Sequence, residues 1–402
     1  MKGLVTIVLV AATICTYAQK GLWRGSLLRA DGKEIVFVFE WKQQAGKNTW
    51  IIQNAGERLV VDNIKWKKDS VFIEMPLFES AFRLQYKNGQ LSGNWIKGTS
   101  TKEMVMPFRA IRQSVRFNAS QPATVNSTGT WAATFTRSNG TTRPAIASFQ
   151  QKGNKATGTF LTPSGDYRYL EGVVSGDSLM LSCFDGSHAY LFTATIKQHE
   201  IIDGWYYSSA TFKEPWTAVK NAAATLPTDA VAMFVKEGAS DKLDFSFADI
   251  DGQTVSIKDD RFKNKVVVIQ LMGSWCPNCM DETAFLSNYY NTQKNKDVEM
   301  LALAYEYSTN TERSINSLKK FQQRFNVQYP MLITGVTVND SLRTEKTLPQ
   351  LTPVKVFPTT IFIGKDGRVK KIDTGFYGPG TGVYYEEYKK NFYATINALL
   401  KE

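Results

Sequence analysis

The sequence contains few of the residues that build metal sites and disulfide frameworks. Its 402 residues include four cysteines and two histidines. His188 and His199 lie on a predicted strand and beside a predicted turn, and neither has a second ligand at the spacing of a metal site. Removal of an N-terminal signal would leave Cys183, Cys276 and Cys279, an odd number that argues against a fold held by disulfide bonds. We expect no bound metal.

A hydrophobic run long enough to cross a membrane is missing as well. The apolar stretch from Leu4 to Cys15 is shorter than the roughly 20 residues that a spanning helix needs. It follows a short positive region and precedes a small-residue site at Ala18, so residues 1–18 are predicted to be a signal peptide. The mature protein is then exported, periplasmic or otherwise extracytoplasmic. The bulky Ile14 before Cys15 argues against a lipid anchor.

Clustered positive charge is a third absence. The formal net charge is +11, but lysine and arginine are scattered, and no arginine-rich helix or nucleic-acid motif occurs. We interpret the excess as a basic, solvated surface and expect no nucleic-acid partner. Hydrophobic residues at 43% and aromatic residues at 12% are sufficient for packed cores, and the chain length predicts two or three domains.

Residues 19–220 have the pattern of an all-β antiparallel region. Short alternating runs are separated by turn dipeptides, and Asp31-Gly32, Asn88-Gly89 and Asn139-Gly140 are strong hairpin signals. Cys183 is interpreted as a buried strand cysteine, because apolar neighbours make a thiol unreactive. The tryptophans interpreted as core residues are Trp23, Trp41, Trp50, Trp66, Trp95, Trp131 and Trp205.

An internal duplication is visible in this region. Two copies, at about residues 20–113 and 128–219, repeat turn and aromatic positions at one constant separation. The matched positions are Gly21, Trp23, Asp31, Gly32, Ser70 and Phe82 in the first copy, and Gly129, Trp131, Asn139, Gly140, Ser178 and Tyr190 in the second. Each copy is predicted to be a meander of roughly seven or eight strands. The pattern leaves open whether they form one barrel, two barrels or sandwiches, and a large barrel would offer a cavity to a small apolar ligand.

A linker at residues 221–240 is predicted to lead to a C-terminal domain at 241–402. The elements expected there are a hairpin at Asp251-Gly252, strands at 265–272 and 298–305, a helix after Cys279, an amphipathic helix at 310–325, a hairpin around 365–367 and a closing helix at about 383–400. Alternating strands and helices followed by a hairpin and a helix predict an α/β sandwich around a mixed sheet.

The stretch from Gly273 to Cys279 joins the buried strand to the first helix of this domain. The unpaired amides and the positive dipole end of the helix favour a thiolate at its first residue. Cys276 is therefore the predicted nucleophile, and Cys279, on the same face, is the predicted resolving thiol. Pro277 fits the first helical turn, where its missing N–H costs nothing. A metal half-site is the weaker alternative, since no second cysteine pair or nearby histidine exists.

Residues about 240–402 resemble the thioredoxin-fold proteins of the TlpA and ResA type, which belong to the redoxin, or AhpC/TSA, superfamily of thiol-disulfide oxidoreductases. The residues that carry the resemblance are Leu243 to Phe245, Asp249 to Gly252, Ser274 to Cys279, and Phe357 to Thr360. The resemblance implies a thioredoxin-like domain outside the cytoplasm. It does not extend to the β region, which we assign to no named family.

The resemblance also implies roles for single residues. Cys276 matches the exposed nucleophile, Cys279 the resolving cysteine and Pro358 the cis-proline that faces them. Glu306 matches a glutamate near the active site and is expected to accept the proton of Cys279. Gln270 stands where cytoplasmic thioredoxins have a buried aspartate, so that proton must go to Glu306 or to water. The remaining expected neighbours of the site are Trp275, Pro277, Asn278 and Phe357.

The favoured function is that of an extracytoplasmic disulfide reductase. Its expected partners are a protein substrate that contains a disulfide and a membrane-bound electron donor, and its redox group is the Cys276–Cys279 pair, with no other cofactor. Two alternatives remain. The β region could be a ligand- or partner-binding module with an appended redox domain. Peroxide reduction is less favoured, because no proline lies shortly before Cys276.

Overall fold

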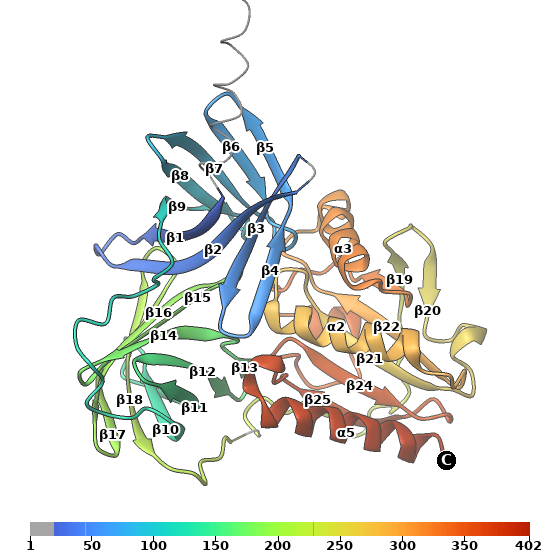
Figure 1. Ribbon diagram of the computed structural model, residues 1–402. Coiled ribbons are helices and arrows are strands. Elements are labelled where there is room, and N and C mark those ends of the chain that lie inside the picture. Colours follow the sequence, from blue (N-terminus) through green and yellow to red (C-terminus); the bar gives the residue numbers. More distant parts are fainter. Residues whose placement is uncertain (1–19, 45, 228) are drawn as a thin grey trace, which may run out of the picture.

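The computed structural model describes residues 20–44, 46–227 and 229–402. The chain forms three β-sheets, and they meet beside the N-terminal end of helix α2 (Pro277–Thr292) (Figure 1). We call strands β1–β9 the first β unit and strands β10–β18 the second β unit. The predicted signal peptide, residues 1–18, lies outside the described residues. Within the described ranges, no helix is long and apolar enough to cross a membrane.

The first β unit is an open antiparallel sheet with the order β4-β3-β2-β1-β9-β8-β7-β6-β5. Its strands are β1 (Gly21–Leu28), β2 (Glu34–Gln44), β3 (Lys47–Asn54), β4 (Glu57–Val61), β5 (Asn63–Lys67), β6 (Ser70–Glu74), β7 (Ser80–Lys87), β8 (Gln90–Lys97) and β9 (Met104–Arg112). Strands β4 and β5 form the two edges of this sheet. The predicted hairpin turns at Asp31-Gly32 and Asn88-Gly89 are confirmed, because they join β1 to β2 and β7 to β8.

The second β unit repeats this order but closes on itself. Its strands are β10 (Gly129–Thr136), β11 (Thr142–Lys152), β12 (Lys155–Thr162), β13 (Gly165–Asp166), β14 (Leu170–Ser175), β15 (Ser178–Phe184), β16 (Ala189–Lys197), β17 (Glu200–Ser208) and β18 (Phe212–Lys220). Strand β12 pairs with both β11 and β14, which completes a ring of eight strands. Each unit therefore has nine strands rather than the predicted seven or eight, and the two units are separate sheets.

The internal duplication is confirmed by equivalent strands and by a shared glycine position. Gly93 in β8 and Gly204 in β17 each face a backbone carbonyl of the neighbouring strand. A Cβ at Gly93 would lie 2.2 Å from the oxygen of Arg83, and one at Gly204 would lie 2.3 Å from that of Trp216. Both values are far shorter than a van der Waals contact, so each position admits only glycine without a shift of the backbone.

Aromatic side chains fill the interiors of both units. Phe135, Phe160 and Phe192 pack with Trp216 inside the second unit, with ring centroids 4.6 to 6.4 Å apart. Most predicted core tryptophans are buried, Trp66 is partly buried, and Trp205 is 36% exposed, so the core interpretation is wrong for Trp205. The buried tryptophans are Trp23, Trp41, Trp50, Trp95, Trp131 and Trp216. The small apolar ligand considered for a large barrel stays a prediction.

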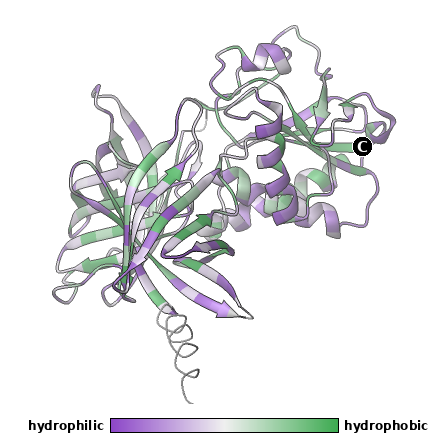
Figure 2. Cartoon of the chain, turned by 90° about the horizontal axis from the view of Figure 1, so that it is seen from above, coloured by the Kyte–Doolittle hydropathy of each residue, from purple (hydrophilic) through white to green (hydrophobic). Residues whose placement is uncertain are grey.

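The C-terminal domain contains a mixed seven-stranded sheet with the order β20-β19-β23-β22-β21-β24-β25. Its strands are β19 (Ser246–Asp249), β20 (Thr254–Ser256), β21 (Val266–Met272), β22 (Val298–Ala304), β23 (Met331–Ile333), β24 (Thr359–Ile363) and β25 (Val369–Thr374). Strand β21 pairs in parallel with β22 and in antiparallel orientation with β24. Every residue of β21 is buried, as its sequence predicts, in which Gln270 alone is polar, and hydrophobic residues follow the central strands in Figure 2.

Helices cover one face of this sheet. They are α2 (Pro277–Thr292), α3 (Thr311–Phe325) and α5 (Val383–Leu399). The opposite face is covered by residues 233–262 and by the segment that follows the short helix α4 (Arg343–Thr347). Asn310 caps α3 by accepting the N–H of Arg313 at 2.8 Å, and Asn326 ends it in the left-handed conformation. The predicted α/β sandwich is confirmed, and helix α2 runs from the centre of the molecule towards its outer edge (Figure 1).

Candidate active site

Cys276 lies at the end of the buried strand β21, where the chain enters helix α2. It is the N-cap residue, and its sulfur accepts the N–H of Cys279 at 3.2 Å. Its thiol also lies 3.6 Å from the carbonyl oxygen of Phe357. Both cysteines are free thiols, with Cys276 5% exposed and Cys279 completely buried. This arrangement directs the amide of Cys279 towards Cys276, the more exposed of the two sulfurs.

Pro358 lies directly before β24, next to the residue whose carbonyl contacts Cys276. The Phe357–Pro358 peptide bond is cis, and it places the Phe357 carbonyl against the Cys276 sulfur. Trp275 packs edge-on against Phe357, with ring centroids 5.8 Å apart, and stacks on Tyr307 at 5.2 Å. Its indole N–H donates to the carbonyl of Tyr305 at 2.8 Å. These half-buried rings form an apolar rim beside the reactive sulfur.

Cys279 is held as a protonated thiol. Burial raises its pKa well above the usual value, and the Cys276 sulfur and the Glu282 carboxylate raise it further. A resolving thiol must lose its proton before it attacks a mixed disulfide. The site therefore needs a base that can act on Cys279.

Glu282 is a buried carboxylate one helical turn beyond Cys279. It accepts hydrogen bonds from the Gln270 amide at 2.8 Å, the Thr360 hydroxyl at 2.6 Å and the Tyr388 hydroxyl at 2.9 Å. Burial raises its pKa to about 7 in spite of these three donors. Glu282 can thus exchange a proton near neutral pH, and the sequence reasoning missed it.

Glu306 follows β22 and binds the turn in front of the nucleophile. Its two carboxylate oxygens accept the backbone N–H of Ser274 at 2.8 Å and the Ser274 hydroxyl at 2.6 Å. Burial raises its pKa to about 7. Among the described contacts of Glu306, none joins it to Cys279, so its expected role as proton acceptor stays a prediction. Its observed contact is with the backbone two residues before Cys276.

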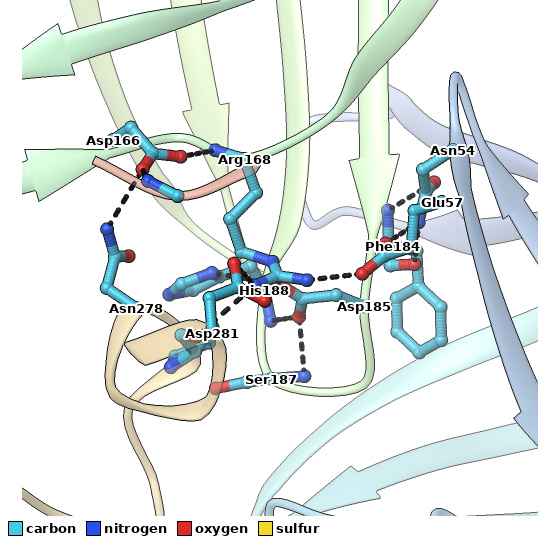
Figure 3. A network of polar contacts seen from close by, with 12 residues as sticks. Asn54, Glu57, Asp166, Arg168, Phe184, Asp185, Ser187, His188, Asn278 and Asp281 are labelled. Atoms are coloured by element: carbon cyan, nitrogen blue, oxygen red, sulfur yellow. Dashed lines mark hydrogen bonds and ion pairs between the residues drawn. The ribbon is translucent and has the colours of Figure 1, made fainter. Parts of the chain in front are cut away.

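Residues of the second β unit reach the same turn (Figure 3). The hydroxyl of Ser187 donates to the carbonyl of Trp275 at 3.2 Å, and the guanidinium of Arg168 donates to the carbonyl of Pro277 at 3.2 Å. The amide of Asn278 donates to Asp166 at 3.3 Å and to the carbonyl of Phe376 at 3.2 Å. Pro277 and Asn278 are consequently buried.

The structure thus brings together the predicted residues Trp275 to Cys279, Phe357 and Pro358, and Glu306 binds Ser274, two residues before Cys276. The sequence carried a signal for Glu282, since a residue at the third position after Cys279 lies on the same face of the helix, and this face is buried. Arg168, Asp166 and Ser187 carried no such signal, because they lie about a hundred residues earlier in the chain.

Two other groups named from the sequence, Cys183 and His188, belong to the second β unit. Cys183 is completely buried in β15, as predicted, and burial raises its pKa well above the usual value. The Nδ1 atom of His188 lies 3.2 Å from Asp185. In the part of the chain that the structure describes, no group of three or more histidine, cysteine or acidic side chains is arranged to hold a metal.

Comparison with known proteins agrees with this site. Residues 218–383 match the family model described as Redoxin. The chain is 28% identical over 141 residues to the thiol-disulfide oxidoreductase ResA of Bacillus subtilis, a match of 35% of this chain and 69% of that protein. It is 30% identical over 132 residues to ResA of Geobacillus thermodenitrificans, covering 33% of this chain and 66% of that protein. The aligned region spans about two thirds of these relatives.

Similar solved structures have related names. One is a thiol-disulfide isomerase from Corynebacterium glutamicum, 14% identical, with a TM-score of 0.32 over 42% of this chain and 99% of that chain. Another is a thioredoxin-family thiol:disulfide interchange protein from Chlorobium tepidum, 17% identical, with a TM-score of 0.30 over 40% of this chain and 97% of that chain.

The family match and the ResA relatives confirm the resemblance inferred for the C-terminal region. Residues 218–383 match the Redoxin model, and the ResA relatives support a thiol-disulfide oxidoreductase activity for this region. The residues before 218 lie outside the family match.

Proposed function

We propose that this protein is an exported disulfide reductase that works through a mixed disulfide at Cys276. The observation that carries the proposal is the pairing of a nucleophile at the N-cap of α2 with a fully buried, protonated partner thiol. We further propose a signal peptide at 1–18, a linker at 221–240 and a redox domain at 241–402. The division is supported by the end of β18 at Lys220 and the start of β19 at Ser246.

The reaction consists of two thiol-disulfide exchanges. In the first, the thiolate of Cys276 attacks one sulfur of a substrate disulfide, a mixed disulfide forms, and the other substrate sulfur leaves as a thiolate. In the second, Cys279 loses its proton and attacks the Cys276 sulfur, which releases the remaining substrate thiolate. Two electrons pass to the substrate, and the Cys276–Cys279 pair becomes a disulfide.

Glu282 is the base that we assign to the second exchange. It contributes to the raised pKa of Cys279, and its own pKa of about 7 matches the pH at which proton transfer is required. Gln270 orients this carboxylate, because its amide donates to Glu282 and also lies 3.4 Å from the carbonyl of Cys279. Glu306 instead fixes the Ser274 backbone and so positions Cys276.

Continued turnover needs a source of electrons outside the protein. A membrane-bound dithiol donor would return two electrons to the Cys276–Cys279 disulfide by the same exchange chemistry. Such a donor fits the export predicted from residues 1–18. The Trp275, Tyr307 and Phe357 rim is the surface on which an extended segment of a substrate protein would lie.

The proposal is tested by trapping the intermediate. Cys279→Ser protein, reduced and mixed with an unfolded disulfide-containing protein, is expected to accumulate a covalent adduct through Cys276, seen as a mass shift that dithiothreitol reverses. Wild-type protein should release the substrate in reduced form, and Cys276→Ser protein should form no adduct. An adduct formed equally well by Cys276→Ser protein would contradict the assignment.

A further inference from the structure

The second β unit does not merely adjoin the redox domain, because it contacts the dithiol turn on both sides of the nucleophile. Ser187 binds the carbonyl of the residue before Cys276, and Arg168 binds the carbonyl of the residue after it. Asp166 binds the Asn278 side chain and, at 2.7 Å, the backbone N–H of Gly378. Two separate segments of the second β unit make these contacts, one from β13 to the start of β14 and the other between β15 and β16.

Arg168 is the centre of this junction (Figure 3). Its side chain is 1% exposed and forms ion pairs with Glu57 of the first β unit, Asp185 of the second and Asp281 of helix α2. One guanidinium therefore connects all three sheets through carboxylates. The planar fork of arginine allows these contacts at the same time, which a lysine ammonium could not reproduce in full.

The charges of Arg168 and its partner carboxylates influence how stable a thiolate is at Cys276. Three carboxylates surround one cation at the start of α2, the end where the helix dipole favours negative charge on Cys276. Burial raises the pKa of Asp281 to about 6 even though Arg168 opposes this shift. Near pH 8 the Asp281 carboxylate is charged in the wild-type protein, because Arg168 opposes the effect of burial, and the ion pairs of Arg168 offset the negative charge of its three carboxylates at this end of the helix.

We propose that the second β unit is part of the redox site, so that both halves of the chain set the reduction potential. Arg168 is a positioning residue, which holds the Cys276–Cys279 turn and balances the charge of the surrounding carboxylates. The proposal rests on the disulfide reductase function. It explains why Pro277 and Asn278, between the two cysteines, are buried by the β region. Cys276 remains the group that reacts with substrate.

The test is the equilibrium of the full mature chain with glutathione mixtures at pH 8, read by mass spectrometry after acid quenching. In Arg168→Met, the unbalanced carboxylates destabilise a thiolate at Cys276. The constant for oxidation of the pair should therefore rise about tenfold, or about 30 mV towards a more reducing potential for a two-electron couple. Arg168→Lys keeps the charge and should stay within about threefold of wild type.

Asp281→Asn provides a change of opposite sign. It removes one carboxylate without altering the shape of the side chain, so the oxidation constant should fall about threefold. If Arg168→Met does not fold, the oxidation constant of Asp281→Asn tests the inference by itself. Arg29→Met is the matched control, because Arg29 is a buried arginine that pairs with Asp31 at 2.9 Å and joins the two β units through the carbonyl of Ser208 at 3.0 Å. Its constant should match that of wild type.

The results distinguish failure of this inference from failure of the proposed reductase function. If Arg168→Met and Asp281→Asn both stay within about twofold of wild type while wild type cycles normally, the junction is structural only and the inference is overturned. If wild type forms no Cys276–Cys279 disulfide at any glutathione ratio, the reductase function fails, and the inference fails with it.

Discussion

The two β units share a strand order but differ in closure and in what they contact. In the second unit, β12 pairs with β11 and β14, and the ring of strands is complete. In the first, β4 and β5 remain edges. The core of the first unit instead takes in Phe184 from the end of β15, which stacks on Phe37 with ring centroids 4.4 Å apart. The duplicated sequence thus gives one self-contained barrel and one sheet completed by its neighbour.

The contacts with the redox domain follow the same division. The second unit reaches the dithiol turn through Ser187, Arg168 and Asp166. The first unit binds helix α3, where Glu79 pairs with Arg313 at 2.6 Å. The second copy therefore contacts the dithiol turn directly, while the first copy holds the domain at α3 and reaches the turn only through the ion pair of Glu57 with Arg168. Four comparisons test this account.

The largest effect is expected from the cysteines themselves. Cys276→Ala should lower disulfide reduction by at least about a thousandfold, because the reaction loses its nucleophile. Cys183→Ala, in the completely buried strand of the second unit, should leave the rate unchanged. Steady-state reduction of a fluorescent disulfide substrate measures both. A comparable loss in Cys183→Ala would show that the redox chemistry is not confined to the C-terminal domain.

The next largest effect is expected from the two buried carboxylates, Glu282 and Glu306, and its size should differ between them. Glu282→Gln removes the base, so resolution of the mixed disulfide should slow by about a hundredfold. Glu306→Gln retains an oxygen that can accept one Ser274 donor, and we expect a loss of about tenfold or less from poorer positioning. Single-turnover fluorescence of a preformed mixed disulfide gives both rates. A larger loss in Glu306→Gln would restore the role first expected for that residue.

The pH profile of resolution provides a third comparison. Glu282 accepts a proton only when ionised, and its pKa is about 7 rather than the usual 4.5. The rate should therefore rise by about tenfold between pH 6 and pH 8, instead of levelling off near pH 5. In Glu282→Gln this rise should disappear. A profile that keeps its rise in the variant would assign the titration to another group.

The smallest effect is expected at the contact of the first β unit. Glu79 and Arg313 have side chains 26% and 33% exposed, so Glu79→Gln should cost only about 1 kcal/mol of stability. The equilibrium with glutathione should not change. Thermal unfolding and the glutathione assay check the two statements. A shift of the redox equilibrium as large as that in Arg168→Met would remove the distinction between the two units.

Much of the C-terminal domain could be predicted because its signals are local. The apolar run at 265–272, the cap and stripe of the helix at 310–325 and the glycine turns each fix their element within a few residues. The hairpins of the β region were recognisable for the same reason. Strand number was underestimated there, since short strands such as Gly165–Asp166 have almost no pattern of their own.

Closure of the second unit and the contacts of the dithiol turn could not be predicted. Pairing of β12 with β14, and the approach of Arg168 to Pro277, join residues whose proximity depends on the complete fold. The exposure of Trp205 could not be predicted for a similar reason, because the alternation of apolar and polar residues along a strand does not reveal which face of the strand is buried. Glu282 could have been predicted to be a buried carboxylate, because it lies one turn after Cys279 on the buried face of helix α2.

The central claim, that the Cys276–Cys279 pair donates electrons, is tested most directly by its reduction potential in the wild-type protein. Equilibration with glutathione or dithiothreitol, followed by mass spectrometry of the trapped species, gives this value. We predict a potential close to that of thioredoxin, about −270 mV, as a reductant requires. A potential near about −120 mV, typical of the oxidant DsbA, would contradict the assignment.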